Sequence, residues 1–385
     1  MSARSGSDKE NAPRIDADEI LAGILEWVDI ESPSHDAAAV NRMVDRVESQ
    51  ARALGGRIER VPGRDGFGDV LTVRTPWGGD GPGVLVLSHL DTVHAIGTKE
   101  AENRIRREGD RVYGPGIYDM KGGAFLAHYA WRHLVRLGQE TPLPITFMFV
   151  PEEEVGSPTS RALIESAALR NKYVLVTEPA RDGGRIVTAR KGVARFVVEI
   201  AGKPAHSGAR HEDGRSAIRE MAHQILELES MTDYERGVTV NVGLVEGGTG
   251  VNVVPARCRA EVDVRVPNPA LAEEMVRRVE GLTPVNPDTT IAVTGGMNRP
   301  PYEKDAGITA LFEHARGLAR EIGFELGDVK TGGGSDGNFT AALGIPTLDG
   351  LGVDGYGAHT DYEHMLYSSL EERATLMLRL FQTLE

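Results

Sequence analysis

Cysteine is almost absent from this chain, in which Cys258 is the single example among 385 residues. A lone cysteine excludes an internal disulfide and a thiolate metal cluster. Because Cys258 lies in a segment of alternating polar and apolar residues, we expect a buried, inert thiol on a strand. Long apolar runs are missing too, and none approaches the roughly 18 residues that a membrane-spanning helix needs. We therefore expect no membrane span.

A surplus of positive charge is also missing. The 43 basic residues stand against 57 acidic ones, which gives a formal net charge of −14, and no run of Lys or Arg offsets it. We therefore expect neither nucleic acid nor an anionic membrane as a partner. Residues 1–14 are polar and lack the apolar stretch of a signal peptide, so we expect a flexible leader on a cytoplasmic protein.

A chain of this length exceeds one ordinary core, so we expect two domains. Up to about residue 190, helical patterns alternate with continuous apolar strands at 84–87, 145–150 and 173–176. Such strands indicate a mostly parallel sheet with helices on its faces. The fold class predicted is α/β. Residues 15–190 and 301–385 would form a catalytic, metal-binding domain around a mixed, mostly parallel sheet.

The pattern changes between residues 191 and 300. The strands expected there, at 195–200, 239–243 and 258–265, alternate polar with apolar residues along their length. Alternation of this kind is typical of an antiparallel sheet with one solvated face, and helical patterns lie between the strands. We predict that residues 191–300 form an inserted α+β domain, which would serve as a dimerisation or lid domain.

Metal-capable side chains follow three apolar strands in succession. His89 and Asp91 come after the first strand, Glu153 and Glu154 after the second, and Glu178 after the third. In open α/β sheets ligands bind beyond the carboxyl ends of the strands, so we expect these side chains to share one rim. His89 and Asp91 are two residues apart and can face the same way, which lets the carboxylate fix the imidazole tautomer for a metal.

A glycine-rich stretch, GPGIYDMKGG at 114–123, places Asp119 before an apolar helical segment at 124–137. An aspartate in this position is most often a helix N-cap, but the position also suits a metal bridge. Carboxylates and imidazoles without thiolates suit Zn, Co or Mn, and two half-sites that share Asp119 suit a pair of ions about 3.5–4 Å apart. The reaction indicated is metal-assisted hydrolysis.

Six motifs in order along the chain make the pattern specific. They are SHLDTV at 88–93, GPG with DMKGG at 114–123, EEVGS at 153–157, TEP at 177–179, GKPAHSG at 202–208 and HT at 359–360. Together they resemble the motifs of the dinuclear zinc peptidases and deacylases, a family that includes glutamate carboxypeptidase, aminoacylase, acetylornithine deacetylase and succinyl-diaminopimelate desuccinylase. The resemblance runs from about residue 16 to the end of the chain.

The resemblance implies two divalent metal ions, with zinc as the expected metal and cobalt or manganese as alternatives. It also implies a cis peptide bond between Asp119 and Met120. Asp119 would bridge the two ions, with one further pair of ligands on each. The implied metal ligands are His89 and Glu178 on one ion, Glu154 and His359 on the other, and Asp119 on both.

The resemblance further implies that Asp91 orients His89 and that Glu153 is the general base for the attacking water. Two neighbouring alternatives stay open. In the acidic run at 152–154, the motif that assigns the base and the ligand could be placed one residue earlier, although the VGS that follows the run fixes the register used here. His364 lies five residues after His359 and leads toward the terminal helix, whereas His359 follows a glycine-rich loop, so we favour His359.

In the resembling family, the histidine that matches His206 reaches across a dimer and stabilises the tetrahedral oxyanion. We therefore expect a homodimer, formed through the inserted domain. The resemblance also implies that Asn252 and Arg299 bind substrate, and an arginine can hold a terminal carboxylate with two hydrogen bonds. Gly333 and Gly334 lie in a glycine-rich loop whose backbone amides could face a substrate anion.

The function expected is hydrolysis of the amide bond of a small peptide or N-acyl amino acid. Carboxypeptidase-like release of a C-terminal amino acid, with glutamate as a candidate, is favoured over deacylation of an N-acyl amino acid. A non-catalytic binding protein on the same fold would be expected to lack a ligand or the base, and none is missing. A nucleotide-binding transferase is disfavoured because GxxxxGK[ST] is absent. The sequence names neither the acyl group, the preferred side chain nor the native metal.

Overall fold

The computed structural model describes residues 14–385, so the predicted leader lies outside the described residues except for Arg14. The chain forms two compact units. Unit 1 comprises the described residues up to Thr188 together with Lys304–Val329 and Ser335–Glu385, and unit 2 comprises Ala189–Glu303 and Lys330–Gly334. The roles predicted for the two domains remain proposals. None of the helices among residues 14–385 is long and apolar enough to cross a membrane.

Unit 1 is built on a six-stranded sheet in the order β1-β2-β6-β3-β7-β16. Its strands are β1 Arg57–Val61, β2 Val70–Arg74, β6 Ile145–Val150, β3 Val84–His89, β7 Tyr173–Val176 and β16 Thr347–Leu348. Strand β3 pairs in parallel with β6 and β7, β16 pairs in parallel with β7, and β1 and β2 join antiparallel. The sheet is therefore mixed and mostly parallel. The four parallel strands, β6, β3, β7 and β16, end at the same edge of the sheet.

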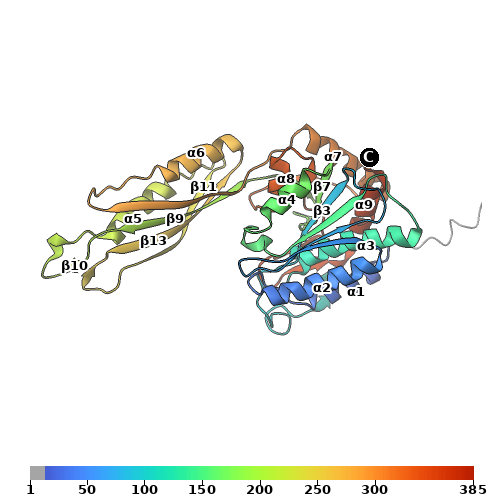
Figure 1. Cartoon of the computed structure of the whole chain (residues 1–385), viewed down its shortest axis with the longest axis horizontal. Helices are drawn as coiled ribbons and strands as arrows, with labels where there is room; N and C mark the ends of the chain where they lie inside the picture. Colours follow the sequence, from blue (N-terminus) through green and yellow to red (C-terminus); the bar gives the residue numbers. More distant parts are fainter. Residues whose placement is uncertain (1–13) are drawn as a thin grey trace, which may run out of the picture. The chain divides into compact units, whose positions relative to one another are not determined.

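Helices cover both faces of this sheet (Figure 1). The helices of unit 1 are α1 Ala17–Val28, α2 Ala37–Ala53, α3 Gly122–Leu137, α4 Arg161–Ala168, α7 Ala306–Ile322, α8 Gly337–Ala342 and α9 Leu370–Thr383. On one face, Phe147 of β6 stacks on Trp131 of α3 and meets Phe381 of α9 edge to face. On the other face, Ile164 of α4 and Phe339 of α8 belong to one buried cluster with residues of β2, β3, β6 and β7.

Short elements complete unit 1 and its borders. A small sheet has the order β17-β18-β5-β4, and β8 pairs with β15. Their bounds are β4 Arg106–Glu108, β5 Arg111–Tyr113, β8 Ile186–Arg190, β15 Asp328–Thr331, β17 Gly355–Tyr356 and β18 His364–Leu366. Short helical turns of unit 1 are η1 Ile117–Lys121, η2 Glu153–Val155 and η4 Tyr367–Ser369, whereas η3 His211–Asp213 lies in unit 2.

Unit 2 is an antiparallel sheet in the order β11-β13-β9-β14. Its elements are β9 Gly192–Ala201, β10 Ala205–His206, α5 Ala217–Glu229, β11 Thr239–Gly247, β12 Val253–Val254, β13 Arg257–Val266, α6 Pro269–Glu280 and β14 Thr290–Arg299. Residues of α5 and α6 share one core with the strands, so both helices cover the same face of the sheet (Figure 1). Cys258 is buried and free on β13. Strand β14 has no counterpart in the sequence prediction.

Candidate metal centre

The predicted ligands in unit 1 lie where adjacent strands end. His89 is the last residue of β3, Glu154 lies in the turn η2 after β6, and Glu178 follows β7. Because β6, β3 and β7 are neighbours in the sheet, these three side chains meet at one edge. Asp119 comes from η1, immediately before α3, and its peptide bond to Met120 is cis, as the resemblance implied.

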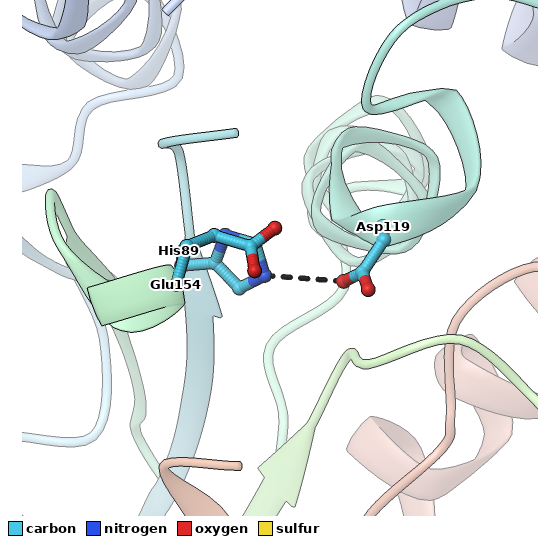
Figure 2. A group of neighbouring side chains, drawn as sticks. All are labelled: His89, Asp119 and Glu154. Atoms are coloured by element: carbon cyan, nitrogen blue, oxygen red, sulfur yellow. Dashed lines mark hydrogen bonds and ion pairs between the residues drawn. The ribbon is translucent and has the colours of Figure 1, made fainter. Parts of the chain in front are cut away.

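Asp119 lies between two histidines. Its Oδ1 is 3.3 Å from Nε2 of His89, and its Oδ2 is 3.4 Å from Nε2 of His359. The same nitrogen of His89 is 3.8 Å from Oε1 of Glu178, and that of His359 is 2.9 Å from Oε2 of Glu154. Figure 2 shows His89, Asp119 and Glu154 converging on one point. Each oxygen of Asp119 thus faces its own imidazole and carboxylate, which is the arrangement that a bridging ligand requires.

Among residues 14–385, two groups of side chains have possible metal-ligand atoms within 4.8 Å of one another. They are His89, Asp119 and Glu154 in one group, and His89, Glu153 and Glu178 in the other. The second group includes Glu153, which the resemblance assigns as a base and not as a ligand. The structure therefore brings all five predicted ligands and Glu153 together in unit 1.

Burial shapes the electrostatics of this cluster. Burial acts to raise the pKa of Asp119, but hydrogen bonds with His359 and His89 outweigh it and hold that pKa below its usual range. Burial and the charge of Asp119 raise the pKa of Glu154 to about 8. Hydrogen bonds with Asp119 and Glu154 raise the pKa of His359 to about 11. Several carboxylates here compete for few positive charges.

A divalent cation fits this donor set. Oε1 of Glu154 is buried and finds no hydrogen-bond partner among residues 14–385. Leaving a buried carboxylate oxygen without a partner is costly, and a metal ion would satisfy it. Imidazole and carboxylate donors without thiolate match the preferences of Zn, Co or Mn.

Asp91 touches the imidazole in two ways. Nδ1 of His89 is 2.9 Å from the carbonyl oxygen of Asp91 and 3.3 Å from its Oδ1. Because both neighbours are acceptors, Nδ1 carries the proton, which leaves Nε2 free for a metal. The carboxylate of Asp91 also accepts hydrogen bonds from the hydroxyl of Ser34, at 2.6 Å, and from the backbone N–H groups of Glu153 and Glu154. Sequence reasoning missed Ser34, for which no motif gives a signal.

The triple acid separates into residues with different surroundings. Glu152 is fully buried, and its Oε1 accepts hydrogen bonds from Thr159, through backbone N–H and hydroxyl, and from the N–H of Ser160. Its carboxylate is thus engaged by the start of α4. Glu153 and Glu154 are the members of the run that join the groups around His89.

His364 is the first residue of β18, which the turn η4 connects to the terminal helix α9. It pairs with Tyr113 and Tyr356 in the small sheet. Its ring lies 5.1 Å from the ring of Tyr113, and its Nδ1 is 2.9 Å from the carbonyl oxygen of Tyr362. It is His359 that reaches Asp119 and Glu154.

The remaining predicted residues belong to unit 2. His206 is exposed on β10, and its Nδ1 accepts hydrogen bonds from the N–H groups of Gly208 and Ala209, both at 3.2 Å. The proton of a neutral imidazole then resides on Nε2, which makes His206 a hydrogen-bond donor to solvent. The carbonyl of the exposed Asn252 accepts from the N–H of Ser207, so Asn252 lies beside the same turn.

Arg299 is buried at the end of β14, where a Cβ on Gly334 would lie only 2.6 Å from its Cδ. The glycine loop presents carbonyls to Arg190, whose Nη1 donates to Gly333 at 3.1 Å and to Gly334 at 3.3 Å. The N–H of Gly333 points to Oγ1 of Thr331, at 3.4 Å. The predicted use of its amide for a substrate anion thus competes with a contact inside the loop.

Residues 85–383 match the family model of peptidase family M20/M25/M40. Carboxypeptidase G2 of Pseudomonas sp. (strain RS-16) is 31% identical over 373 residues, which cover 95% of this chain and 89% of that protein. An acetylornithine deacetylase of Myxococcus xanthus is 29% identical over 252 residues, which cover 62% of this chain and 64% of that protein.

A solved structure has the same fold. The M20 family metallo-carboxypeptidase Sso-CP2 from Sulfolobus solfataricus matches with a TM-score of 0.73 at 19% identity, over 95% of this chain and 100% of that one. This likeness confirms the predicted fold class, an α/β chain with a mostly parallel central sheet and additional antiparallel strands.

Proposed function

Because this chain belongs to peptidase family M20/M25/M40, we propose that it is a two-metal hydrolase that cleaves the amide bond of a small peptide or N-acyl amino acid. Membership confirms the resemblance that the motifs indicated, and with it a metal-dependent peptidase or amidohydrolase. The finer proposal is carboxypeptidase-like release of a C-terminal amino acid, with glutamate as the first candidate. It is supported by carboxypeptidase G2, which matches nearly the whole chain.

The observation that carries the proposal is the position of Asp119, whose two oxygens face His89 and His359 separately. We assign Asp119 as the bridge between two ions, with Zn as the proposed metal. His89 and Glu178 would bind one ion, and Glu154 and His359 the other. When bound, such a pair of cations activates water near neutral pH and polarises the scissile carbonyl.

The chain's own groups then move the proton and hold the charge. Asp91 keeps the proton of His89 on Nδ1, so that Nε2 stays available as a ligand. Glu153 takes a proton from the attacking water and passes it to the leaving nitrogen, as a general base and then a general acid. The breaking bond is the amide C–N bond, and the products are a carboxylate and an amine.

We further propose that His206 acts on the partner's site in a homodimer formed through unit 2, where its Nε2–H would donate to the tetrahedral oxyanion. The tautomer fixed by Gly208 and Ala209 supports this donor role. Asn252 and Arg299 are proposed to bind the substrate carboxylate, and Gly333 and Gly334 to line the same subsite.

A substrate panel tests the proposal. Purified protein, analysed for metal content, is incubated with peptidyl-glutamates, acyl-glutamates and matched aspartate, alanine and ornithine derivatives. We expect release of a C-terminal amino acid that stops on chelation and returns when Zn or Co is added. Preference for acetylated ornithine over every peptide would move the assignment to deacylation. A metal-loaded protein that releases nothing from the panel would contradict both.

A further inference from the structure

Glu363 is a fully buried acid to which the sequence motifs assigned no role. Its Oε1 accepts hydrogen bonds from the backbone N–H groups of Tyr118 and Asp119, both at 2.9 Å. Its Oε2 accepts from the N–H of Gly116, at 3.1 Å, and lies 2.6 Å from Nε2 of His94. Since Nε2 of His94 faces a carboxylate, it is the donor of that bond. One carboxylate thus receives four hydrogen bonds.

Three of these four donors belong to the loop that presents Asp119. This loop has an unusual backbone: Gly116 has φ of 71°, and a Cβ there would lie 2.5 Å from Cγ2 of Thr92. Its N–H groups point inward, where a buried donor without an acceptor is costly. Glu363 supplies the acceptors for Gly116, Tyr118 and Asp119 at once. The main chain of Asp119 is therefore fixed by a residue that lies far away in the sequence.

The segment that carries Glu363 also carries His359, four residues earlier. It is held at its end by main-chain contacts, because the carbonyl oxygen of Glu363 accepts from the side chain of Asn103, at 3.1 Å, and from the N–H of Gly114, at 3.4 Å. One short segment thus provides an imidazole that faces Asp119 and the carboxylate that fixes the backbone of Asp119. The relative position of the two metal-facing groups is set by this link.

We propose that Glu363, oriented by His94, is a positioning residue that holds Asp119 in its metal-binding geometry before any metal arrives. A loop that is already ordered loses no conformational entropy when the metal binds. Its metal affinity is therefore higher than that of a loop that must become ordered on binding. The proposal rests on the proposed function only in naming Asp119 as a metal ligand. The ordering of the loop is a property of the chain itself.

Glu363→Gln is the central variant. A carboxamide has one acceptor oxygen and an NH₂ group, so in either orientation its NH₂ faces at least one of the loop's N–H groups. Glu220→Gln is the matched control in unit 2, because the buried Glu220 likewise accepts from two backbone N–H groups, those of Val285 and Asn286. A milder pair of variants tests the hydrogen bond between His94 and Glu363. In His94→Gln the side chain can still donate to Glu363, whereas in His94→Leu it cannot.

The first readout is hydrogen exchange of the metal-free full chain. In Glu363→Gln we expect the amides of residues 116–119 to exchange at least tenfold faster than in the unsubstituted protein, while amides of β3 and β6 keep their protection. The second readout is the dissociation constant for Zn, measured against a competing chelator, together with the visible spectrum of the Co form. We expect at least tenfold weaker Zn binding and an altered Co spectrum. His94→Leu should show smaller changes of both kinds, in amide exchange and in Zn binding. His94→Gln should give the values of the unsubstituted protein.

Several results would overturn the proposal. They are unchanged exchange at residues 116–119, unchanged Zn affinity despite a loosened loop, or a uniform loss of protection that Glu220→Gln reproduces. If Glu363→Gln is too unstable to purify, the two His94 variants decide by the same measurements. If Zn affinity falls as expected but the unsubstituted protein hydrolyses none of the substrate panel, the positioning role stands and the proposed function fails.

Discussion

The backbone N–H of Glu153 donates a hydrogen bond to Oδ1 of Asp91, at 3.1 Å. This bond ties the turn after β6 to the residue that holds Nδ1 of His89. The N–H of Glu154 makes the equivalent bond to Oδ2 of Asp91, at 3.2 Å. One buried carboxylate therefore fixes the position of the proposed base, the neighbouring ligand and the imidazole together.

Glu153→Gln should separate catalysis from metal binding. Because glutamine cannot accept the proton of the attacking water, we expect kcat to fall by about 10²–10⁴-fold while both metals remain bound. Metal analysis and kcat on the favoured substrate check this. Loss of one metal would instead show that Glu153 is a ligand, as its proximity to His89 and Glu178 allows.

Glu152→Gln is the matched control for the triple acid. Its carboxamide oxygen can accept the same hydrogen bonds from Thr159 and Ser160 while the NH₂ group takes the place of Oε2, so we expect the free energy of unfolding to change by less than about 1 kcal/mol. The kcat of the folded protein should stay within about twofold, since this change does not touch the proton pathway. A large fall in kcat with unchanged stability would move the base one residue earlier.

The two late histidines should respond in opposite ways. His359→Ala removes the nitrogen that faces Asp119 and Glu154, so we expect loss of one metal equivalent and of turnover. His364→Phe keeps an aromatic ring beside Tyr113 and should retain both metals. Metal content of the two purified variants, measured side by side, decides between them. Retention of two metals in His359→Ala would contradict the ligand assignment.

Action of His206 on a partner subunit predicts complementation. His206→Ala and Glu153→Ala homodimers should each be nearly inactive. When the two variants are refolded together, about half of the dimers should be mixed, and each mixed dimer has one intact site of two. The mixture should therefore recover about a quarter of the activity of the unsubstituted protein. Activity of the mixture, with each variant refolded alone as the control, measures this. No recovery, with mixed dimers demonstrated, would mean that His206 does not act in trans.

His128 predicts a specific pH dependence of stability. It is buried on α3, with its ring 5.7 Å from that of Trp27 and 5.9 Å from that of Phe125. Burial, with a contribution from Arg132, lowers its pKa from 6.5 to about 3. Between these values the unfolded chain binds a proton that the folded chain does not bind, so stability falls as pH drops through this window.

His128→Leu should remove this pH dependence of stability. Relative to the variant, the unsubstituted protein should lose up to about 1.4 kcal/mol of unfolding free energy per pH unit between pH 6 and pH 4. Urea unfolding at several pH values gives the difference in free energy of unfolding between the two proteins. The contributions of the other titrating groups cancel in this difference. Parallel curves over that range would show that His128 is protonated in the folded protein.

The edge of the sheet that carries the site could be predicted from the sequence because it depends on patterns within short stretches of the chain. Continuous apolar strands predict burial between two helical layers, and parallel neighbours end together, so His89 and Glu178 had to lie close. The helix after Asp119 was predicted from the local apolar spacing of residues 124–137, and α3 contains this segment.

What escaped prediction depends on contacts between distant segments. Glu363 is buried whereas Asp361, two residues earlier, is exposed, because the carboxylate of Glu363 accepts hydrogen bonds from the distant loop at 116–119. Strand β18 has three residues, too few for a periodic pattern, so the sequence did not predict it. Strand β14 escaped because Gly295 and Gly296 interrupt its alternation. The carbonyls of the glycine loop face inward because of Arg190, which no local pattern shows.

The proposed ligands are spread unevenly along the chain, and this has a consequence for synthesis. Four of them precede residue 180, whereas His359 emerges about 180 residues later, a delay on the order of 10–40 s at about 5–20 residues per second. Glu363, the proposed positioning residue for Asp119, is synthesised four residues later still. The ligands proposed for one ion are thus synthesised early, whereas the ligand set proposed for the other ion stays incomplete until His359 is made.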